Sequence, residues 1–418
     1  SMSALAKFLL SAGKTVAGSD AQDGVYVREL RDLGVKIYIG EERRSVKDYD
    51  VIVYTDAIKP DDFQLLEAAK SNKTIISRGQ LLYEVSRVFK HVIAVSGCHG
   101  KTTCTSMLAH VFSRAGKSFG VHIGGRDKKF SNFHLTGNEY FITEACEYKK
   151  NFLLLKPEIA VILNSEPDHL ECYGSMEKLL EAYASFASFA DTSITRYGDN
   201  FGGITFGYNK KATLYAKNIT CEDGLYRFSV CEGNVNLGEI RLNVYGKHNI
   251  LNALAVVTVC LNVGMGFDVI AQGIADFDGV ERRFERIGEV YGAVCIADYA
   301  HHPSEIRATL QAARKIAKGK LITVFQPHTY SRTKNLFKDF VKVLSPLNKL
   351  LIYRTFPARE YFDDAGSALT LSQAVKRSVY GDSAGDIKNF IDCAEEGDVV
   401  LFLGAGNIYD IAKQIINS

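Results

Sequence analysis

A loop between two glycines, followed by a lysine and two threonines, carries the clearest chemistry in the chain (Gly97 to Thr103). A β-rich run ends at Val95, just before the loop, and apolar residues at helical spacing follow it. Gly97 and Gly100 allow the backbone to curl so that several N–H groups point at phosphate oxygens. The N-terminus of the following helix adds its partial positive charge. The stretch therefore predicts a phosphate-binding loop between a strand and a helix.

The spacing of this loop, Gly-x-x-Gly-Lys-Thr, is two residues shorter than the Walker form with four residues between its glycines. Lys101 is placed to reach the outer phosphates of a nucleotide, and the hydroxyl of Thr102 is placed to bind Mg²⁺. The alternative is an ordinary strand-to-helix turn with a solvated lysine. We favour the phosphate loop, because the flanking strand and helix lie where this mechanism needs them.

Polar residues follow two further predicted strands of the same region. One strand ends in Glu144, and the next ends in a polar cluster: Asn164, Glu166, Asp168 and His169. Because ligands of open parallel sheets bind beyond the carboxyl ends of the strands, we expect these groups and the phosphate loop to share one crevice. The oxygens of Thr102 and Glu144 suit Mg²⁺, whereas the imidazole of His169 suits Mn²⁺ better.

Each of these assignments has a simpler alternative. Glu144 could form a salt bridge with Lys101 in the empty site, and His169 could cap a helix or lie in the core. The density of polar groups after a buried strand favours a functional site, because burying such groups without partners is costly.

The chain has 418 residues and a formal net charge of +2. This length is sufficient for roughly two to four domains, each with its own core. The charge gives no indication of nucleic acid or an acidic membrane surface as a partner, and no apolar run reaches the length of a membrane span. Nine scattered cysteines without a Cys-x-x-Cys pair favour free thiols in a reducing cytoplasm over disulfides or a zinc site.

The first segment alternates predicted strands and helices, which is typical of a nucleotide-binding domain. It opens directly on a helical pattern, and strands are expected at 15–20, 35–39 and 51–54. We expect that the strand and glycine turn that would precede this helix are missing from the sequence. Asp20, at the end of the first visible strand, could bond a ribose hydroxyl or serve as a capping or turn residue.

Two short stretches predict domain boundaries, one at 87–91 and one at 281–284. Between them, short alternating strands after Ala190 are expected to extend the central domain at one edge. A strongly apolar helix then begins, with Asn249 and Asn252 on one face of its first turn. These two amides could read the edge of a base or cap the helix.

The last segment alternates again, with strands predicted at 293–298, 320–325, 349–353 and 398–403. Polar residues once more follow strand ends, at 298–303 and 326–332. A glycine-rich turn at 404–407 is a weak signal, since it fits any strand-to-helix turn. The whole chain therefore predicts an α/β fold.

Taken in order, these stretches resemble the Mur ligases, and most closely their alanine-adding branch; the phosphate loop also resembles that of the related folylpolyglutamate synthetases. The motifs that carry the resemblance are Ser19-Asp20, 55–58, 98–103, 144–147, 164–170, 246–253, 282–284, 298–303, 325–328, 331–333 and 403–406. No single motif is decisive, but the ordered set is highly specific.

The sequence departs from the family pattern at two motif positions. Cys146 stands where the family usually has Asp, and Ala300 stands where it usually has Gly. Some Mur ligases bridge their metals with a carbamylated lysine. No lysine occurs between Lys178 and Lys210 to serve that role, which suits the alanine-adding branch.

The resemblance implies three domains. A Rossmann-like UDP-sugar-binding domain would span 1–88, a central ATPase-type domain with a mostly parallel sheet 89–284, and a Rossmann-like amino-acid-binding domain 285–418. The implied cofactors are ATP and Mg²⁺, with Mn²⁺ as the alternative metal.

By the same resemblance, Lys101 holds the ATP phosphates, and the metal ligands are Thr102, Glu144 and His169. Further ATP contacts are implied at Gly97, Cys98, His99, Gly100, Thr103, His248, Asn249, Asn252 and Arg283. UDP-sugar contacts are implied at Ser19, Asp20, Thr55, His99 and Glu166. The alanine pocket is implied at His301, His328 and Arg332, where an arginine is the natural partner of the alanine carboxylate. The residues implied to be catalytic are Lys101, Glu144, His169, His301 and Arg332.

The implied reaction is ATP-dependent ligation of L-alanine to the lactyl carboxylate of UDP-N-acetylmuramate through an acyl phosphate. It would be a step of peptidoglycan precursor synthesis in the bacterial cytoplasm. Such an enzyme would have small-molecule partners, no nucleic acid and no membrane insertion, and would be a monomer or a homodimer.

Two alternatives to this reaction remain. A ligase that attaches a recycled tripeptide to the same sugar would be compatible with 298–303, whereas 325–333 favours alanine addition. A non-catalytic sensor of UDP-sugar or nucleotide would not need Glu144, His169 and the alanine pocket intact together.

Overall fold

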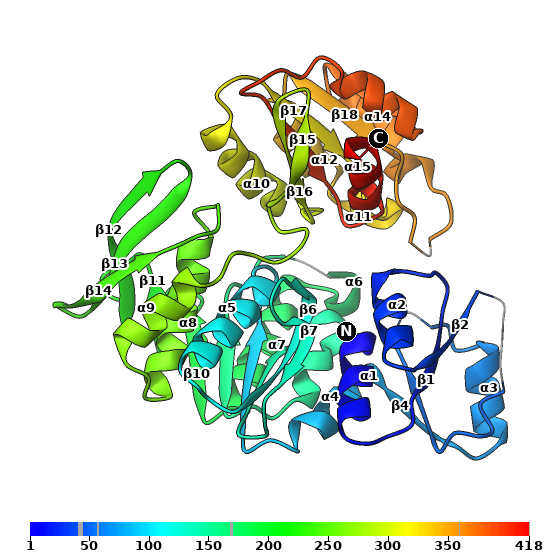
Figure 1. Ribbon diagram of the computed structural model, residues 1–418, viewed down its shortest axis with the longest axis vertical. Helices are drawn as coiled ribbons and strands as arrows, with labels where there is room; N and C mark the ends of the chain where they lie inside the picture. Colours follow the sequence, from blue (N-terminus) through cyan, green and yellow to red (C-terminus); the bar gives the residue numbers. More distant parts are fainter. Residues whose placement is uncertain (41–44, 57, 168–169, 359, 418) are drawn as a thin grey trace. The chain divides into compact units, whose positions relative to one another are not determined.

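Apolar strands alternate with amphipathic helices along the chain, and Figure 1 shows how the computed structural model arranges them. The structure describes residues 1–40, 45–56, 58–167, 170–358 and 360–417. The chain divides into two compact units. The first unit consists of Ser1–Lys217, Val230–Gly238 and Leu251–Asp276, and the second of Asn218–Ser229, Glu239–Ile250 and Phe277–Ser418.

The N-terminal part of the first unit contains two small parallel sheets, each of two strands. Their strands are β1 (Ala17–Asp20) with β2 (Lys36–Ile39), and β3 (Val51–Tyr54) with β4 (Thr74–Ser77). The helices are α1 (Met2–Ser11), α2 (Val25–Asp32), α3 (Phe63–Lys70) and α4 (Arg78–Ser86). The opening helix and the three strands expected from the sequence are confirmed, with ends that differ by at most two residues.

Helices α1 and α4 share a core with the central sheet. Leu5 and Phe8 of α1 and Val85 of α4 lie in the same buried cluster as Phe141 and Phe152. Their burial removes a continuous apolar surface from water, which is the main force that holds such layers together.

A ten-stranded sheet follows, in the order β14-β13-β12-β11-β10-β9-β5-β8-β6-β7. Its strands are β5 (His91–Ser96), β6 (Phe119–Asp127), β7 (Ser131–Leu135), β8 (Tyr140–Glu144), β9 (Ile159–Ile162), β10 (Thr192–Arg196), β11 (Ile204–Gly207), β12 (Leu214–Glu222), β13 (Leu225–Glu232) and β14 (Val235–Arg241). The inner strands β9, β5, β8 and β6 pair in parallel. Their carboxyl ends therefore open at one edge, which is where a ligand of such a sheet binds.

The helical elements of this region are α5 (Lys101–Arg114), the 3₁₀ segment Tyr148–Leu154, α6 (Leu170–Tyr173), α7 (Met176–Ser188), α8 (Asn249–Asn262) and α9 (Phe267–Ala275). Helix α5 follows β5 and is deeply buried, and its predicted apolar residues Met107, Leu108 and Val111 are fully enclosed. The strands after Ala190 extend the sheet at one edge, as the sequence predicts.

The C-terminal domain is built on a six-stranded sheet in the order β15-β16-β20-β17-β18-β19. Its strands are β15 (Glu285–Val290), β16 (Ala293–Asp298), β17 (Leu321–Phe325), β18 (Lys349–Tyr353), β19 (Ser378–Gly381) and β20 (Val399–Leu403). Only β15 runs antiparallel to its neighbour. The four predicted strands are confirmed, whereas the two edge strands β15 and β19 were not expected.

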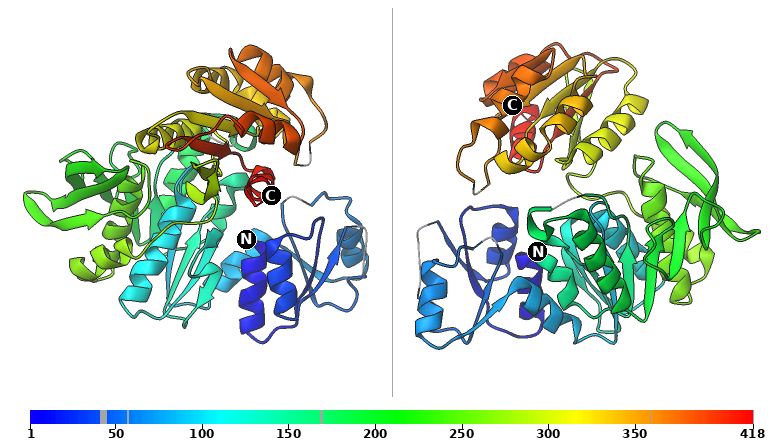
Figure 2. Two further views of the ribbon diagram at one scale, coloured as in Figure 1. Left: turned by 45° about the horizontal axis from the view of Figure 1, so that its top comes forward. Right: turned by 180° about the vertical axis from the view of Figure 1, so that it is seen from behind.

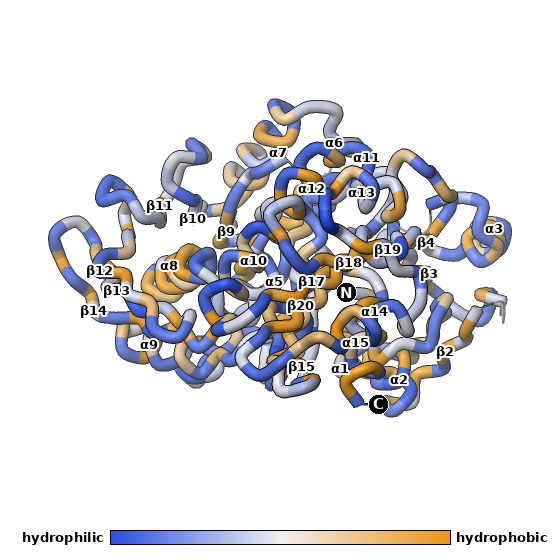
Figure 3. The backbone as a smooth tube through the Cα atoms, turned by 90° about the horizontal axis from the view of Figure 1, so that it is seen from above, coloured by the Kyte–Doolittle hydropathy of each residue, from blue (hydrophilic) through white to orange (hydrophobic). Residues whose placement is uncertain are grey.

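Helices cover both faces of this sheet (Figures 1 and 2). They are α10 (Pro303–Ile316), α11 (Tyr330–Asn335), α12 (Phe337–Leu344), α13 (Ala368–Ala374), α14 (Ala384–Ile391) and α15 (Ile408–Ile416). Leu401 and Leu403 of β20 belong to one core, shared with α10, α12 and α13. Val400 and Phe402 belong to the opposite core, shared with α14 and α15. This alternation is the two-residue period of a strand buried on both faces, and β17 and β20 accordingly run hydrophobic in Figure 3.

None of the helices in the described part of the chain combines the length and the apolar character that a membrane crossing requires.

Candidate active site

The phosphate loop joins β5 to α5, and both of its glycines have a conformation that favours glycine. Gly97 has a φ of 132° and Gly100 a φ of 85°. A Cβ atom on Gly97 would lie 3.2 Å from backbone atoms of Asn164, and one on Gly100 would lie 2.5 Å from Oδ1 of Asn252. The strand, loop and helix predicted from the sequence are therefore present, and two asparagines from other elements approach the loop closely.

Hydrogen bonds join the turn after β9 to this loop. The backbone N–H of His99 donates to Oδ1 of Asn164 at 3.0 Å, and Nδ2 of Asn164 donates back to the carbonyl of His99 at 2.9 Å. The Cys98 thiol donates to the carbonyl of Glu166 at 2.8 Å, and the Glu166 carboxylate lies 3.4 Å from Nε2 of His99. The structure thus brings together the loop and the Asn164–Glu166 part of the predicted cluster. Asp168 and His169 lie outside the described residues.

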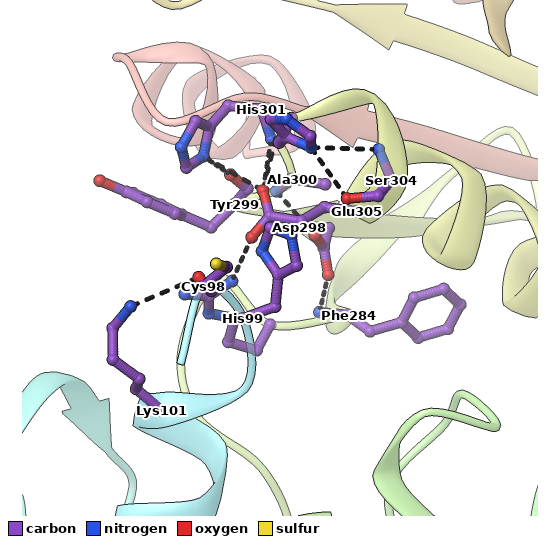
Figure 4. A network of polar contacts seen from close by, with 12 residues as sticks. Cys98, His99, Lys101, Phe284, Asp298, Tyr299, Ala300, His301, Ser304 and Glu305 are labelled. Carbon is purple, nitrogen blue, oxygen red and sulfur yellow. Dashed lines mark hydrogen bonds and ion pairs between the residues drawn. The ribbon is translucent and has the colours of Figure 1, made fainter. Parts of the chain in front are cut away.

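Lys101 begins α5, and its ammonium turns back onto the loop (Figure 4). It donates to the carbonyls of Gly97 and Cys98, at 2.5 and 3.3 Å. Its ion-pair partner is Glu147, whose two carboxylate oxygens lie 3.0 and 3.1 Å from Nζ. Burial disfavours the charged ammonium, but the attraction of Glu147 outweighs it, so the pKa of Lys101 lies above its ordinary value.

The alternative interpretation of Glu144, as the salt-bridge partner of Lys101, is wrong. Glu144 ends β8, and its carboxylate accepts the backbone N–H of Gly124 on β6 at 2.5 Å. Glu147 lies three residues later, in the segment that passes beside the loop, and it forms the salt bridge that this alternative gave to Glu144.

Thr102 is buried in the first turn of α5, and within the described residues no hydrogen bond involves its hydroxyl. Glu144 keeps lone pairs beyond the one that faces Gly124. The described residues contain no cluster of three His, Cys, Asp or Glu side chains arranged to hold a metal.

The residues implied for the nucleotide base lie on or beside α8. Asn252 approaches Gly100 of the phosphate loop. Asn249 instead donates to the carbonyl of Tyr245 at 2.7 Å, and His248 is exposed. Asn249, His248 and Arg283 belong to the second unit.

The residues implied for UDP-sugar occupy strand ends of the N-terminal segment. Ser19 donates to Oε1 of Gln64 at 2.9 Å, and the carbonyl of Thr55 accepts the N–H of Ile58. Oδ1 of Asp20 accepts the N–H of Gln22 at 3.1 Å, which is the geometry of the turn residue offered as its alternative. The side chains of Ser19 and Asp20 are exposed and accessible to a ligand.

In the second unit, the carboxylate of one half-buried residue organises the loop after β16 (Figure 4). Asp298 accepts the N–H groups of Phe284 and Ala300, each at 2.7 Å. Burial raises the pKa of Asp298 to about 6, although the charge of Arg283 opposes the rise. The Ala300 position is thus fixed through its backbone.

The three residues implied for alanine lie side by side. The rings of His301 and His328 are 5.9 Å apart, edge to face, and Nη1 of Arg332 lies 3.3 Å from Nδ1 of His328. His328 also stacks on Phe356 with ring centroids 5.5 Å apart. Burial, together with the neighbouring His301 and Arg332, lowers the pKa of His328 to about 4, so it is neutral at pH 7.

Arg332 has unused capacity for a ligand. Its Nη1 atom engages the ring and carbonyl of His328, and in the described part of the chain its other guanidinium nitrogens make no hydrogen bond. A planar guanidinium with open donors fits a carboxylate. The same domain contains a cavity of about 470 Å³ whose lining includes Phe356, Gln326, Tyr330 and Arg354.

Three acidic residues at these sites escaped the sequence-based site prediction. The sequence could have indicated Glu147 as a site residue, because it lies in the same motif as Glu144. Glu305 could also have been indicated, since it completes a capping box with His302 at the start of α10; its carboxylate accepts the N–H of His301 at 3.1 Å. Glu360 holds the N–H of Ser331 at 2.9 Å from a loop 29 residues away, and no local pattern indicates it.

Comparison with known proteins places the chain among relatives that match along its whole length. Three family profiles match in order: "Mur ligase family, catalytic domain" at 1–90, "Mur ligase middle domain" at 95–260 and "Mur ligase, glutamate ligase domain" at 282–406. The UDP-N-acetylmuramate–L-alanine ligase of Clostridium beijerinckii is 36% identical over 438 residues, and that of Clostridium botulinum (strain Langeland) is 39% identical over 437 residues. Each match covers 100% of this chain and 95% of the relative.

Solved structures give the same result for the fold. The UDP-N-acetylmuramate–alanine ligase of Thermotoga maritima superimposes with a TM-score of 0.86 at 27% identity, covering 100% of this chain and 96% of that one. A murein peptide ligase of Psychrobacter arcticus has the same fold, with a TM-score of 0.75 at 22% identity and coverage of 100% and 96%. The three-domain α/β architecture expected from the sequence is confirmed, and the chain belongs to the Mur ligase family.

Proposed function

We propose that this protein joins L-alanine to the lactyl carboxylate of UDP-N-acetylmuramate with hydrolysis of ATP to ADP and phosphate. The reaction belongs to peptidoglycan precursor synthesis in the bacterial cytoplasm. Its main support is that relatives carrying this activity in their names are 36–39% identical to the chain from end to end. The observation within the molecule that carries it is the open guanidinium of Arg332 beside His301 and His328.

The phosphate loop would hold the ATP phosphates. The N–H groups of the first turn of α5 would face an anion bound there, and the helix would add its partial positive charge. Lys101 lies at the mouth of this loop and would bind the outer phosphates. Asn252, which touches Gly100, and Asn249 would face the adenine.

The donor groups present fit a hard divalent cation. Thr102 is a buried residue whose hydroxyl forms no hydrogen bond within the described chain, and Glu144 offers carboxylate oxygens. We propose that Thr102 and Glu144 bind Mg²⁺, with His169 as the proposed ligand of a second metal. Bound Mg²⁺ would neutralise charge on the transferring phosphoryl group.

Amide formation needs an activated acid, because a carboxylate is a poor acyl donor. In the proposed sequence the lactyl carboxylate attacks the γ-phosphorus of ATP, and ADP leaves. The neutral amine of alanine then attacks the acyl carbon of the acyl phosphate, and inorganic phosphate leaves with the bonding electrons. The acyl phosphate must be protected from water, which in such enzymes requires closure of the site.

The alanine pocket would orient the amine for that attack. Arg332 would hold the alanine carboxylate through its open nitrogens. His301, whose Nδ1 lies 2.9 Å from the carbonyl of Tyr299 and 3.4 Å from Glu305, would orient the amine or accept its proton. Asp298 would act indirectly, since it fixes the backbone that carries this histidine.

One assay tests the proposal. ADP release is measured with UDP-N-acetylmuramate and, in turn, L-alanine, L-serine, glycine and the murein tripeptide. Alanine should give the highest rate. Release stimulated by the tripeptide alone would identify a recycling ligase, and no turnover with any acceptor would favour a nucleotide or UDP-sugar sensor.

A further inference from the structure

We propose that Glu147 is the resting counter-ion of Lys101, and that it makes nucleotide binding depend on a divalent cation. This inference rests on the proposed function, because it concerns the same ATP site. Glu147 is a positioning residue in this proposal: it would act on the nucleotide through Lys101.

The ion pair is close and enclosed. Both oxygens of Glu147 lie within 3.1 Å of the Lys101 ammonium, and its side chain is 1% exposed, against 16% for that of Lys101. A carboxylate buried to this degree needs a compensating charge, because an isolated ion is strongly disfavoured away from water. The two side chains therefore form a neutral pair before any phosphate arrives.

The ammonium is also saturated with acceptors. Lys101 has three protons, and four oxygens surround it: two from Glu147 and the carbonyls of Gly97 and Cys98. A phosphate oxygen must therefore displace one of these acceptors to reach Lys101. It also meets a lysine whose charge is already compensated.

Glu147 is held in place by its own backbone. The Tyr173 hydroxyl donates to the carbonyl of Glu147 at 2.5 Å, and the N–H of Lys150 donates to the same carbonyl at 2.9 Å. Lys101 has the longer and more flexible side chain. We therefore expect Lys101 to swing toward a bound nucleotide while Glu147 stays.

Neighbouring groups leave Glu147 as the relevant negative charge on this lysine. Glu144 is directed to Gly124. A metal-free nucleotide therefore meets a compensated lysine, whereas a nucleotide whose charge is reduced by Mg²⁺ is far less affected.

The test measures the dissociation constant of ADP by titration calorimetry, with Mg²⁺ and with EDTA, for the full-length protein and Glu147→Gln. The unmodified protein should bind ADP much more weakly in EDTA. In E147Q the uncompensated Lys101 should strengthen ADP binding in EDTA by about tenfold. The ratio of the dissociation constant in EDTA to that with Mg²⁺ should therefore be smaller in E147Q than in the unmodified protein.

Three further variants accompany E147Q. Glu84→Gln makes the same chemical change at an exposed glutamate paired with Arg87, and it should leave both constants unchanged. Glu144→Gln should also narrow the ratio, but through weaker binding with Mg²⁺ and unaltered binding in EDTA. Glu147→Asp retains the charge at a greater distance from Lys101 and should lie between E147Q and the unmodified protein. It supplies the measurement if E147Q does not fold.

The results separate this inference from the proposed function. If the unmodified protein binds no ADP under either condition, both fail. If it binds ADP with Mg²⁺ dependence and E147Q shows the same ratio, or weaker binding in both conditions, the counter-ion role is overturned and the ATP site stands.

Discussion

The phosphate loop and the loop after β17 have the same construction, yet they differ in what holds them. Each follows a parallel strand and leads into a helix at the carboxyl edge of a sheet. Helix α5 has fourteen residues, of which ten are buried, whereas α11 has six residues and buries Thr333 alone. The first loop thus leads into a buried helix, and the second leads into a largely exposed one.

Their polar contacts differ in the same way. Asn164 bonds to both backbone groups of His99, and Lys101 pairs with a fully buried carboxylate. In the second loop, Ser331 and Lys334 are exposed and are held by acidic residues of the 360–363 segment. Thr329 moreover has a φ of 64°, which is unfavourable for a β-branched residue. We infer that the phosphate site is preformed, while the amino-acid site depends on a separate surface segment.

The largest expected effect separates the two functions of Lys101. Lys101→Met should lower turnover about 1,000-fold, because a charge that stabilises the transferring phosphate is lost. It should also destabilise the fold by about 3–5 kcal/mol, because buried Glu147 is left without its partner. The double variant K101M/E147Q should regain most of the stability and none of the turnover, as measured by denaturant unfolding and ADP release. A K101M protein as stable as the original would contradict a core role for this loop.

The corresponding change in the second loop should leave stability intact. Arg332→Ala should raise the KM for alanine about 30-fold, equivalent to about 2 kcal/mol for a charge-assisted hydrogen bond. The KM for ATP and the melting temperature should not change, because within the described residues the guanidinium of Arg332 forms hydrogen bonds to His328 alone. An unchanged KM for alanine would remove Arg332 from the pocket.

A smaller effect tests whether the phosphate loop is held from outside. Asn164→Ala removes two hydrogen bonds to the backbone of His99, each worth about 1 kcal/mol. The KM for ATP should rise about tenfold while the KM for alanine stays constant. Steady-state kinetics with each substrate varied in turn will show this; equal shifts in both constants would indicate general disruption instead.

The smallest effect concerns pH. The pKa of His328 is about 4 in the folded protein, below the ordinary value of about 6.5, so the unfolded chain binds the extra proton first. The stabilisation is present above pH 6.5 and is lost as the pH falls toward 4. The melting temperature of His328→Asn should therefore fall less between pH 6.5 and pH 4 than that of the original protein. If plots of melting temperature against pH were parallel for the two proteins, His328 would not be buried as a neutral ring.

The sequence predicted local features well and distant partners poorly. The phosphate loop could be predicted from Gly97, Gly100 and Lys101, because its strand, turn and helix are adjacent in the chain. The grouping of His301 with His328 was implied by the family resemblance, and it agrees with the rule that parallel strands open at one edge.

The salt bridge with Lys101, offered only as the alternative for Glu144, is formed by Glu147, because strand position alone does not show which side chain turns toward the loop. Glu360 and Phe356 reach the second loop through tertiary contacts that no periodicity encodes. The edge strands β15 and β19 were missed because half-exposed or four-residue strands give little pattern.

The small size of the two N-terminal sheets has a consequence for local unfolding. Strands β1 to β4 have four residues each, and a two-stranded sheet is marginally stable by itself. Helices α1 and α4, which flank them in the chain, are anchored in the core of the central sheet. Amide hydrogens of β1 to β4 should therefore exchange with deuterium well before those of α1 and α4. Helices α1 and α4 would then belong to the cooperative unfolding unit of the central sheet, whereas β1 to β4 between them would not.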